Sequence, residues 1–133
     1  MTFYVMKKVV IDKKYKANNS LVSFLTDLPR LFDQEGEMIH DERNIIKKFS
    51  VSGVSFVVKS YKRPLFIQRV VYTFFRKTKA KRAYHNARKI RARGIDTPHE
   101  IAFIEVYQRG LLADGYLATE INTNPDIAGL LVN

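Results

Sequence analysis

Lys59 is the residue whose surroundings most clearly suggest chemistry, because it interrupts an apolar run. In FVVKSYK, residues 56–62, it follows Val57 and Val58 and precedes Tyr61, a pattern typical of a β-strand. An isolated ammonium group is costly to bury, so the side chain must reach water or an anion. Two interpretations are open from these residues alone: a strand lysine that faces solvent, or one that binds an anion.

The positive charge of the chain is concentrated in one block. The formal net charge is +10, and between Arg43 and Ile95 there are sixteen Lys or Arg residues and no Asp or Glu. A field of one sign favours polyanionic partners, which include nucleic acid, anionic lipid head groups and nucleotide phosphates. Within this block, RKTKAKRAYHNARKIRARGIDTP (residues 76–98) predicts a helix with basic residues over its non-apolar side: Lys79, Lys81, Arg82, Arg88, Lys89, Arg91 and Arg93.

Three interpretations of this basic helix are open. It is a solvated face, or it contacts an anionic membrane surface, with the apolar and aromatic groups of LFIQRVVYTFFRK beside the charge. Nucleic-acid binding is the third interpretation, and no zinc-ligand spacing, ribonucleoprotein motif or recognition-helix pattern supports it.

Other kinds of site have little support in the sequence. The chain has no cysteine, which excludes disulfides, thiolate metal ligands and a cysteine nucleophile. His99 and Glu100 do not continue into a zinc-protease motif, because Phe103 stands where the second histidine would fall. No secretory signal or membrane-spanning run is evident, so we expect a cytoplasmic protein, with peripheral contact at the inner face of the cytoplasmic membrane as a further option.

The pattern of elements predicts a single α+β domain over residues 1–133. Strands are expected at 3–11, 44–51, 54–62, 99–107 and 116–121, with Ser52-Gly53 as the turn of a hairpin. Helices are expected after a cap at Asn19 or Ser20, across 64–75 and across 79–93, the last capped by Thr78 and closed by Gly94. Residues 34–43 and 108–115 are predicted to be loops, and a short last helix is considered from Asn124 or Asp126. This order predicts an antiparallel sheet with helices on one side.

The succession VVKSYKRP, TKAKRAYHNARKIRARGIDTP, IAFIE and GYLATE, spread over residues 44–121, resembles the lipopolysaccharide kinase family. These protein-kinase-like enzymes phosphorylate sugars of the lipopolysaccharide inner core. The resemblance implies the fold of the N-terminal lobe of a protein kinase, with Lys59 as the phosphate-binding lysine and residues 79–93 as the adjacent helix. It implies that the backbone of the hinge contacts adenine, at Glu120, Ile121 and Asn122. ATP and Mg²⁺ are the implied cofactors, and a lipid-linked core sugar is the implied acceptor of the intact parent.

The chain departs from the family pattern in three ways. The predicted helix has no carboxylate to pair with the strand lysine, and His85 stands near the place of that acid as a possible lysine-orienting residue. No glycine-rich phosphate loop precedes Lys59. The catalytic loop and metal-binding residues are absent, since the chain ends where the large lobe would begin.

We therefore expect the nucleotide-binding lobe of a core-sugar kinase-like protein, which as this fragment does not catalyse phosphoryl transfer. The alternative is a small basic module that binds nucleic acid or an anionic membrane surface. A third expectation is self-association through apolar lobe surface left bare by the missing large lobe.

Overall fold

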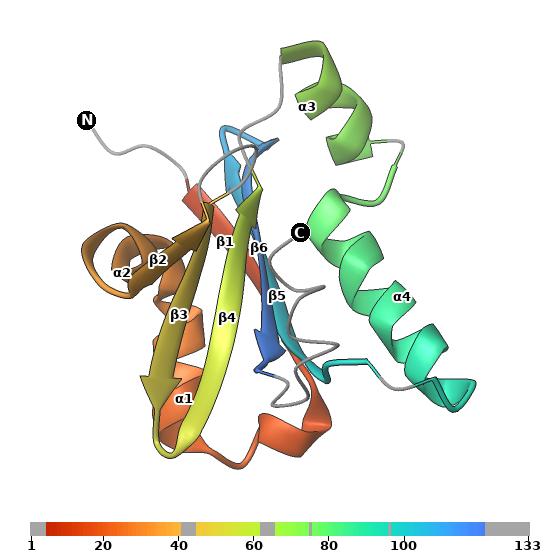
Figure 1. Ribbon diagram of the computed structural model, residues 1–133. Helices are drawn as coiled ribbons and strands as arrows, with labels where there is room; N and C mark the ends of the chain where they lie inside the picture. Colours follow the sequence, from red (N-terminus) through yellow and green to blue (C-terminus); the bar gives the residue numbers. More distant parts are fainter. Residues whose placement is uncertain (1–4, 41–44, 62–65, 75, 96, 122–133) are drawn as a thin grey trace.

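The computed structural model describes residues 5–40, 45–61, 66–74, 76–95 and 97–121, and they form one mixed sheet-and-helix unit (Figure 1). Its six strands form a single sheet in the order β1-β5-β6-β4-β3-β2, in which every neighbouring pair is antiparallel. The strands are β1 (Val5–Ile11), β2 (Glu37–His40), β3 (Ile45–Val51), β4 (Val54–Tyr61), β5 (Glu100–Gln108) and β6 (Leu111–Glu120). The helices are the 3₁₀ turn η1 (Lys13–Tyr15), α1 (Asn19–Thr26), α2 (Leu28–Gln34), α3 (Phe66–Phe74) and α4 (Lys79–Ala92).

Two tight turns with positive φ set the strand pairing. Ser52 and Gly53, with φ of 53° and 80°, connect β3 to β4, which confirms the predicted hairpin. Arg109 and Gly110, with φ of 53° and 81°, do the same between β5 and β6. Because this second turn needs only two residues, β6 already begins at Leu111, and the loop predicted over 108–115 is wrong for most of its length.

The main core lies between the sheet and the pair α1 and α2. Leu21, Leu25, Leu28 and Phe32 of these helices are buried against alternate side chains of the strands, which include Phe56, Val58 and Ile104. Asn18 caps α1 by accepting the Leu21 N–H at 3.1 Å, and Pro29 is accommodated in the first turn of α2. The predicted α+β class and antiparallel sheet are confirmed, but helices cover both faces of the sheet and not one side only, since α4 packs on the face opposite α1 and α2.

Helix α4 packs on β5 and β6 through a second, smaller core. Ala80, Tyr84 and Phe103 are its buried members, and Val10, Tyr61 and Leu117 pack against them. Side chains on a strand alternate between faces, and Val10, Phe103, Leu117 and Lys59 are register partners across four strands. We call this the α4 face of the sheet; α1 and α2 lie on the opposite face (Figure 1).

Both ends of α4 follow the sequence prediction. The Thr78 hydroxyl accepts the Lys81 N–H at 3.1 Å, and Gly94, with φ of 84°, closes the helix while the Ile95 N–H donates to the Ile90 carbonyl. Among the apolar residues of α4, Ala80 and Tyr84 are buried, whereas the Ile90 side chain near the other end is exposed. The sheet contact of α4 is therefore strongest in its first half.

Candidate functional site

Lys59 lies on β4, an inner strand between β3 and β6, and its side chain belongs to the α4 face. It is half-buried, and its Nζ lies 5.2 Å from the centroid of the Tyr61 ring, a cation–π distance. No carboxylate of the described residues pairs with it. The lysine is thus partly removed from water. Its neighbour is an aromatic ring, and no acid of the described residues pairs with it.

Arg82 of α4 is a second cation that acts on Tyr61. Burial raises the pKa of the Tyr61 hydroxyl, and the positive charge of Arg82 lowers it by a smaller amount. The Arg82 Nε is buried and has no hydrogen-bond partner among the described residues. Lys59 of the sheet therefore contacts the Tyr61 ring, the charge of Arg82 acts on the Tyr61 hydroxyl, and a buried guanidinium N–H of Arg82 lacks a described acceptor.

His85 occupies a different part of α4. Its ring contacts the rings of Tyr84 and Phe103, with centroids 5.4 and 6.0 Å apart, and no described contact joins it to Lys59. Phe103 and Lys59 are separated by Leu117 of β6. Burial lowers the pKa of His85, and the neighbouring charges of α4 and of Lys77 lower it further.

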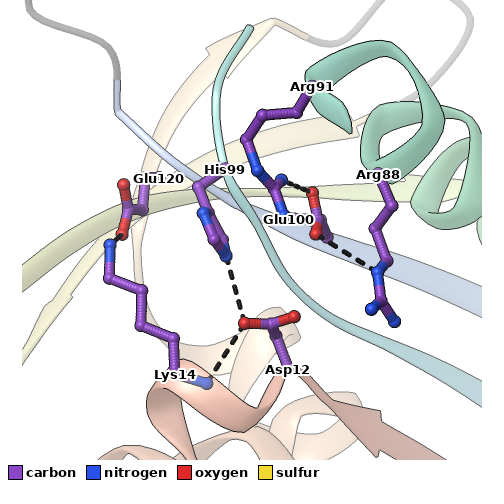
Figure 2. Close-up of polar contacts among 7 residues, drawn as sticks. All are labelled: Asp12, Lys14, Arg88, Arg91, His99, Glu100 and Glu120. Atoms are coloured by element: carbon purple, nitrogen blue, oxygen red, sulfur yellow. Dashed lines mark hydrogen bonds and ion pairs between the residues drawn. The ribbon is translucent and has the colours of Figure 1, made fainter. Parts of the chain in front are cut away.

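The predicted adenine-binding backbone is engaged in the sheet. The Glu120 N–H donates to the His99 carbonyl at 2.9 Å, and the Ile121 N–H donates to the Ser55 carbonyl at 3.3 Å. The Glu120 carboxylate forms an ion pair with Lys14 at 2.8 Å (Figure 2). Adenine would have to use the carbonyl groups of this segment, and Asn122 lies outside the described residues.

The basic residues of α4 do not form one uniform surface. Arg91 forms a hydrogen-bonded ion pair with Glu100, and the Arg88 Nε lies 3.8 Å from the other oxygen of the same carboxylate (Figure 2). Lys79, Lys89 and Arg93 are exposed, whereas Lys81 and Arg82 are half-buried. Sequence reasoning placed all seven charges on the non-apolar side of the helix, but only some of them face water freely.

Two buried glutamates of β5 hold the two ends of α4. Glu100 is fully buried and binds the arginines of the last turns, and Glu105, at 2% exposure, accepts the Thr78 hydroxyl at 2.6 Å beside the first turn. A negative charge near a helix N-terminus is also favoured by the helix dipole. The carboxylates missing from the helix are thus supplied by the strand. Sequence reasoning gave neither residue a role, although two acids in an otherwise apolar strand were a usable signal.

Asp12 and His99 extend this cluster to the end of β1 (Figure 2). The His99 Nε2 lies 3.1 Å from an Asp12 oxygen, which also accepts the Lys14 N–H. Burial raises the pKa of Asp12, but these hydrogen bonds and the charges of His99 and Arg88 outweigh it, so that the pKa is lowered.

Asp12, His99 and Glu100 could each offer a ligand atom to a metal ion, since these atoms lie within 4.8 Å of one another. Each of the three residues is already paired with another group, as Asp12 is with His99 and Glu100 is with Arg91. Ion pairing therefore accounts for the cluster, and an added cation would have to displace the guanidinium groups.

Comparisons with known proteins give no match, neither to a protein-family model nor to a curated protein nor to a solved structure. Among the described residues, no helix combines the length and the apolar character needed to cross a membrane.

Proposed function

We propose that this protein binds the phosphate groups of a nucleotide between β4 and α4, through Lys59 and Arg82. The observation that carries the proposal is the buried Arg82 Nε without a described acceptor, on a residue whose charge acts on the tyrosine that Lys59 contacts. A cation of α4 and a cation of β4 that both act on Tyr61 offer positive charge to one bound anion. Phosphate oxygens are the acceptors that guanidinium and ammonium groups bind best.

The sequence resemblance to the lipopolysaccharide kinases supports the same proposal. A strand lysine, the helix that follows it and a strand hairpin after the helix occur in the chain order that the resemblance implies. α4 has no acid that could pair with the lysine, and Arg82 is the residue of α4 whose positive charge acts on Tyr61 beside Lys59. The proposed role of these residues is therefore to bind anions, and ATP with Mg²⁺ is the proposed ligand. Transfer of its γ-phosphoryl group to a core sugar is proposed only for an intact kinase-like protein that also has a catalytic loop.

The first test is thermal stabilisation by Mg-ATP. A ligand that binds the folded state at one hundred times its dissociation constant stabilises that state by about 2.7 kcal/mol, which raises the melting temperature by several degrees. We expect this rise for the unchanged protein, and its loss in Lys59→Ala and in Arg82→Gln. Lys13→Ala is the matched control, because Lys13 is an exposed lysine of η1 far along the chain from both residues.

The variants also allow the proposal to be refuted. If Mg-ATP raises the melting temperature equally in Lys59→Ala, Arg82→Gln and Lys13→Ala, the nucleotide binds elsewhere. If the unchanged protein shows no rise at millimolar Mg-ATP, it has no nucleotide site of useful affinity.

A second function, polyanion binding, is favoured by the exposed residues Lys79, Lys89 and Arg93, which have no carboxylate partner among the described residues. Binding to duplex DNA should then weaken steeply with salt, with a slope in log affinity of roughly −0.9 for each phosphate neutralised. We expect the triple change to Gln at these positions to reduce the slope by about 2 to 3. Vesicles with anionic lipid, compared with neutral vesicles, test the membrane alternative, and absence of binding to both at low salt would refute this function.

A further inference from the structure

A pocket with a volume of about 370 Å³ lies where α3, α4, β1 and β5 meet. Its walls include Tyr72 and Thr73 of α3, Thr78 and Lys81 at the start of α4, and Tyr107 of β5. Neither Lys59 nor Arg82 is among its described lining residues, so it is separate from the site proposed above. Pockets of a few hundred Å³ are of the size that encloses small molecules.

Four cationic side chains from three parts of the fold line this pocket. Lys8 comes from β1, Arg76 and Lys77 come from the connection between α3 and α4, and Lys81 comes from the first turn of α4. The Arg76 guanidinium lies 5.9 Å from the centroid of the Tyr72 ring, which fixes it against the pocket wall. Lys8 is far from the other three in the sequence, so its convergence with them is a property of the fold.

Among the described residues that line the pocket, the one carboxylate already has hydrogen-bond partners. Glu105 is buried, accepts the Thr78 hydroxyl at 2.6 Å and also forms a hydrogen bond with the Tyr107 hydroxyl. Burial, with the charge and hydrogen bond of Glu105, raises the pKa of Tyr107 to about 12, so this tyrosine stays neutral at physiological pH. Four positive charges and one negative charge leave an excess of three positive charges around the pocket.

We propose that this pocket binds a small-molecule phosphate monoester, whose dianionic group lies among Lys8, Arg76, Lys77 and Lys81. A dianion matches the excess charge better than a carboxylate or a single phosphodiester does. The tyrosine rings of the walls, from Tyr72 and Tyr107, provide contact area for the organic part of the ligand. The N-terminal end of the α4 dipole adds to the attraction for an anion.

The pKa of His85 provides a measure of whether the proposed ligand is bound. Its pKa is lowered first by burial and then by the charges of Lys77, Lys81, Arg88 and Lys89. Two of these cations, Lys77 and Lys81, line the pocket. A phosphate dianion bound between them cancels their effect, so the pKa of His85 must rise on binding.

The test is an NMR titration with phenyl phosphate and, separately, with inorganic phosphate. We expect phenyl phosphate to bind more tightly than inorganic phosphate, and to raise the pKa of His85 when it saturates the unchanged protein. Loss of one charge-assisted contact should weaken binding about tenfold in Lys81→Gln and likewise in Lys8→Gln. Lys89→Gln is the matched control, because it also removes a charge near His85 but lies outside the described pocket lining. We expect the affinity of this variant for phenyl phosphate to change less than about twofold.

Several results would overturn the proposal. These are absence of binding at about 10 mM phenyl phosphate, equal weakening in Lys81→Gln and Lys89→Gln, and saturation without a change in the pKa of His85. If Lys59→Ala abolishes binding of phenyl phosphate and Lys81→Gln does not, the phosphate binds at the nucleotide site instead. Each variant must retain the helical circular dichroism of the unchanged protein, so that lost binding reflects the pocket and not unfolding. Similar weakening of phenyl phosphate binding in Lys8→Gln, on β1, and in Lys81→Gln, on α4, tests the site from both elements.

Discussion

Replacing Tyr84 with alanine is expected to lower the free energy of unfolding by about 3 to 5 kcal/mol, the usual cost of deleting a large buried ring. Tyr84 is only 1% exposed, and its ring packs edge-on to Phe103 with centroids 5.1 Å apart. It is the largest side chain in the small core that joins α4 to the sheet. Since small domains have a total stability of about 5 to 15 kcal/mol, this variant should be markedly destabilised in urea.

Two variants control this experiment. Ile90→Ala removes an apolar side chain from the same helix at a position that is 40% exposed, and should cost less than about 1 kcal/mol. Tyr84→Phe keeps the ring and should retain most of the stability. If Tyr84→Ala is as stable as Ile90→Ala, α4 does not pack on β5 and β6 as described.

The second large effect is expected at Glu100. In Glu100→Ala, Arg91 and Arg88 lose their shared partner, and the buried carboxylate is replaced by a void at the start of β5. Breaking a buried ion pair costs about 3 to 5 kcal/mol. Both arginines can turn toward water here, so we expect a smaller loss of about 2 kcal/mol, with faster hydrogen exchange in the last two turns of α4.

A double-mutant cycle isolates this interaction. Glu100→Gln should lower the free energy of unfolding much less in the Arg91→Gln variant than in the unchanged protein, because the two changes remove the same contact. Glu120→Gln is the matched control, since its pair with Lys14 is exposed and is expected to contribute less than about 1 kcal/mol. Equal losses in Glu100→Gln and Glu120→Gln would contradict the role of Glu100 in holding α4.

The elements with strong local signals could be predicted from the sequence. The Ser52-Gly53 turn, the Thr78 cap and the Gly94 end of α4 each depend on a few adjacent residues, and all three are confirmed. Strand β2 was missed because EMIH is a short, exposed edge strand within a polar stretch of sequence, and only its pairing with β3 defines it. The start of β6 was missed because the turn at Arg109 and Gly110 is tighter than the loop-like composition around it indicates.

The site was harder to predict, because it depends on how the helix is rotated against the sheet. The sequence identified Lys59 as a strand lysine without a helix acid, and both features are present. It could not separate Arg82 from the other basic residues of α4, since the burial of the Arg82 Nε and the effect of its charge on Tyr61 depend on how α4 packs against the sheet. The pairing of Arg91 with Glu100 likewise requires the helix to run back along β5.

The most direct test of the proposed nucleotide site is an NMR titration that compares Mg-ATP, Mg-ADP and adenosine on the unchanged protein. We predict that both phosphorylated ligands shift the amide signals of Lys59, Tyr61 and Arg82, and that adenosine at the same concentration does not. If adenosine produces the same shifts, or if ATP shifts only the exposed positions Lys89 and Arg93, then Lys59 and Arg82 do not bind nucleotide phosphate.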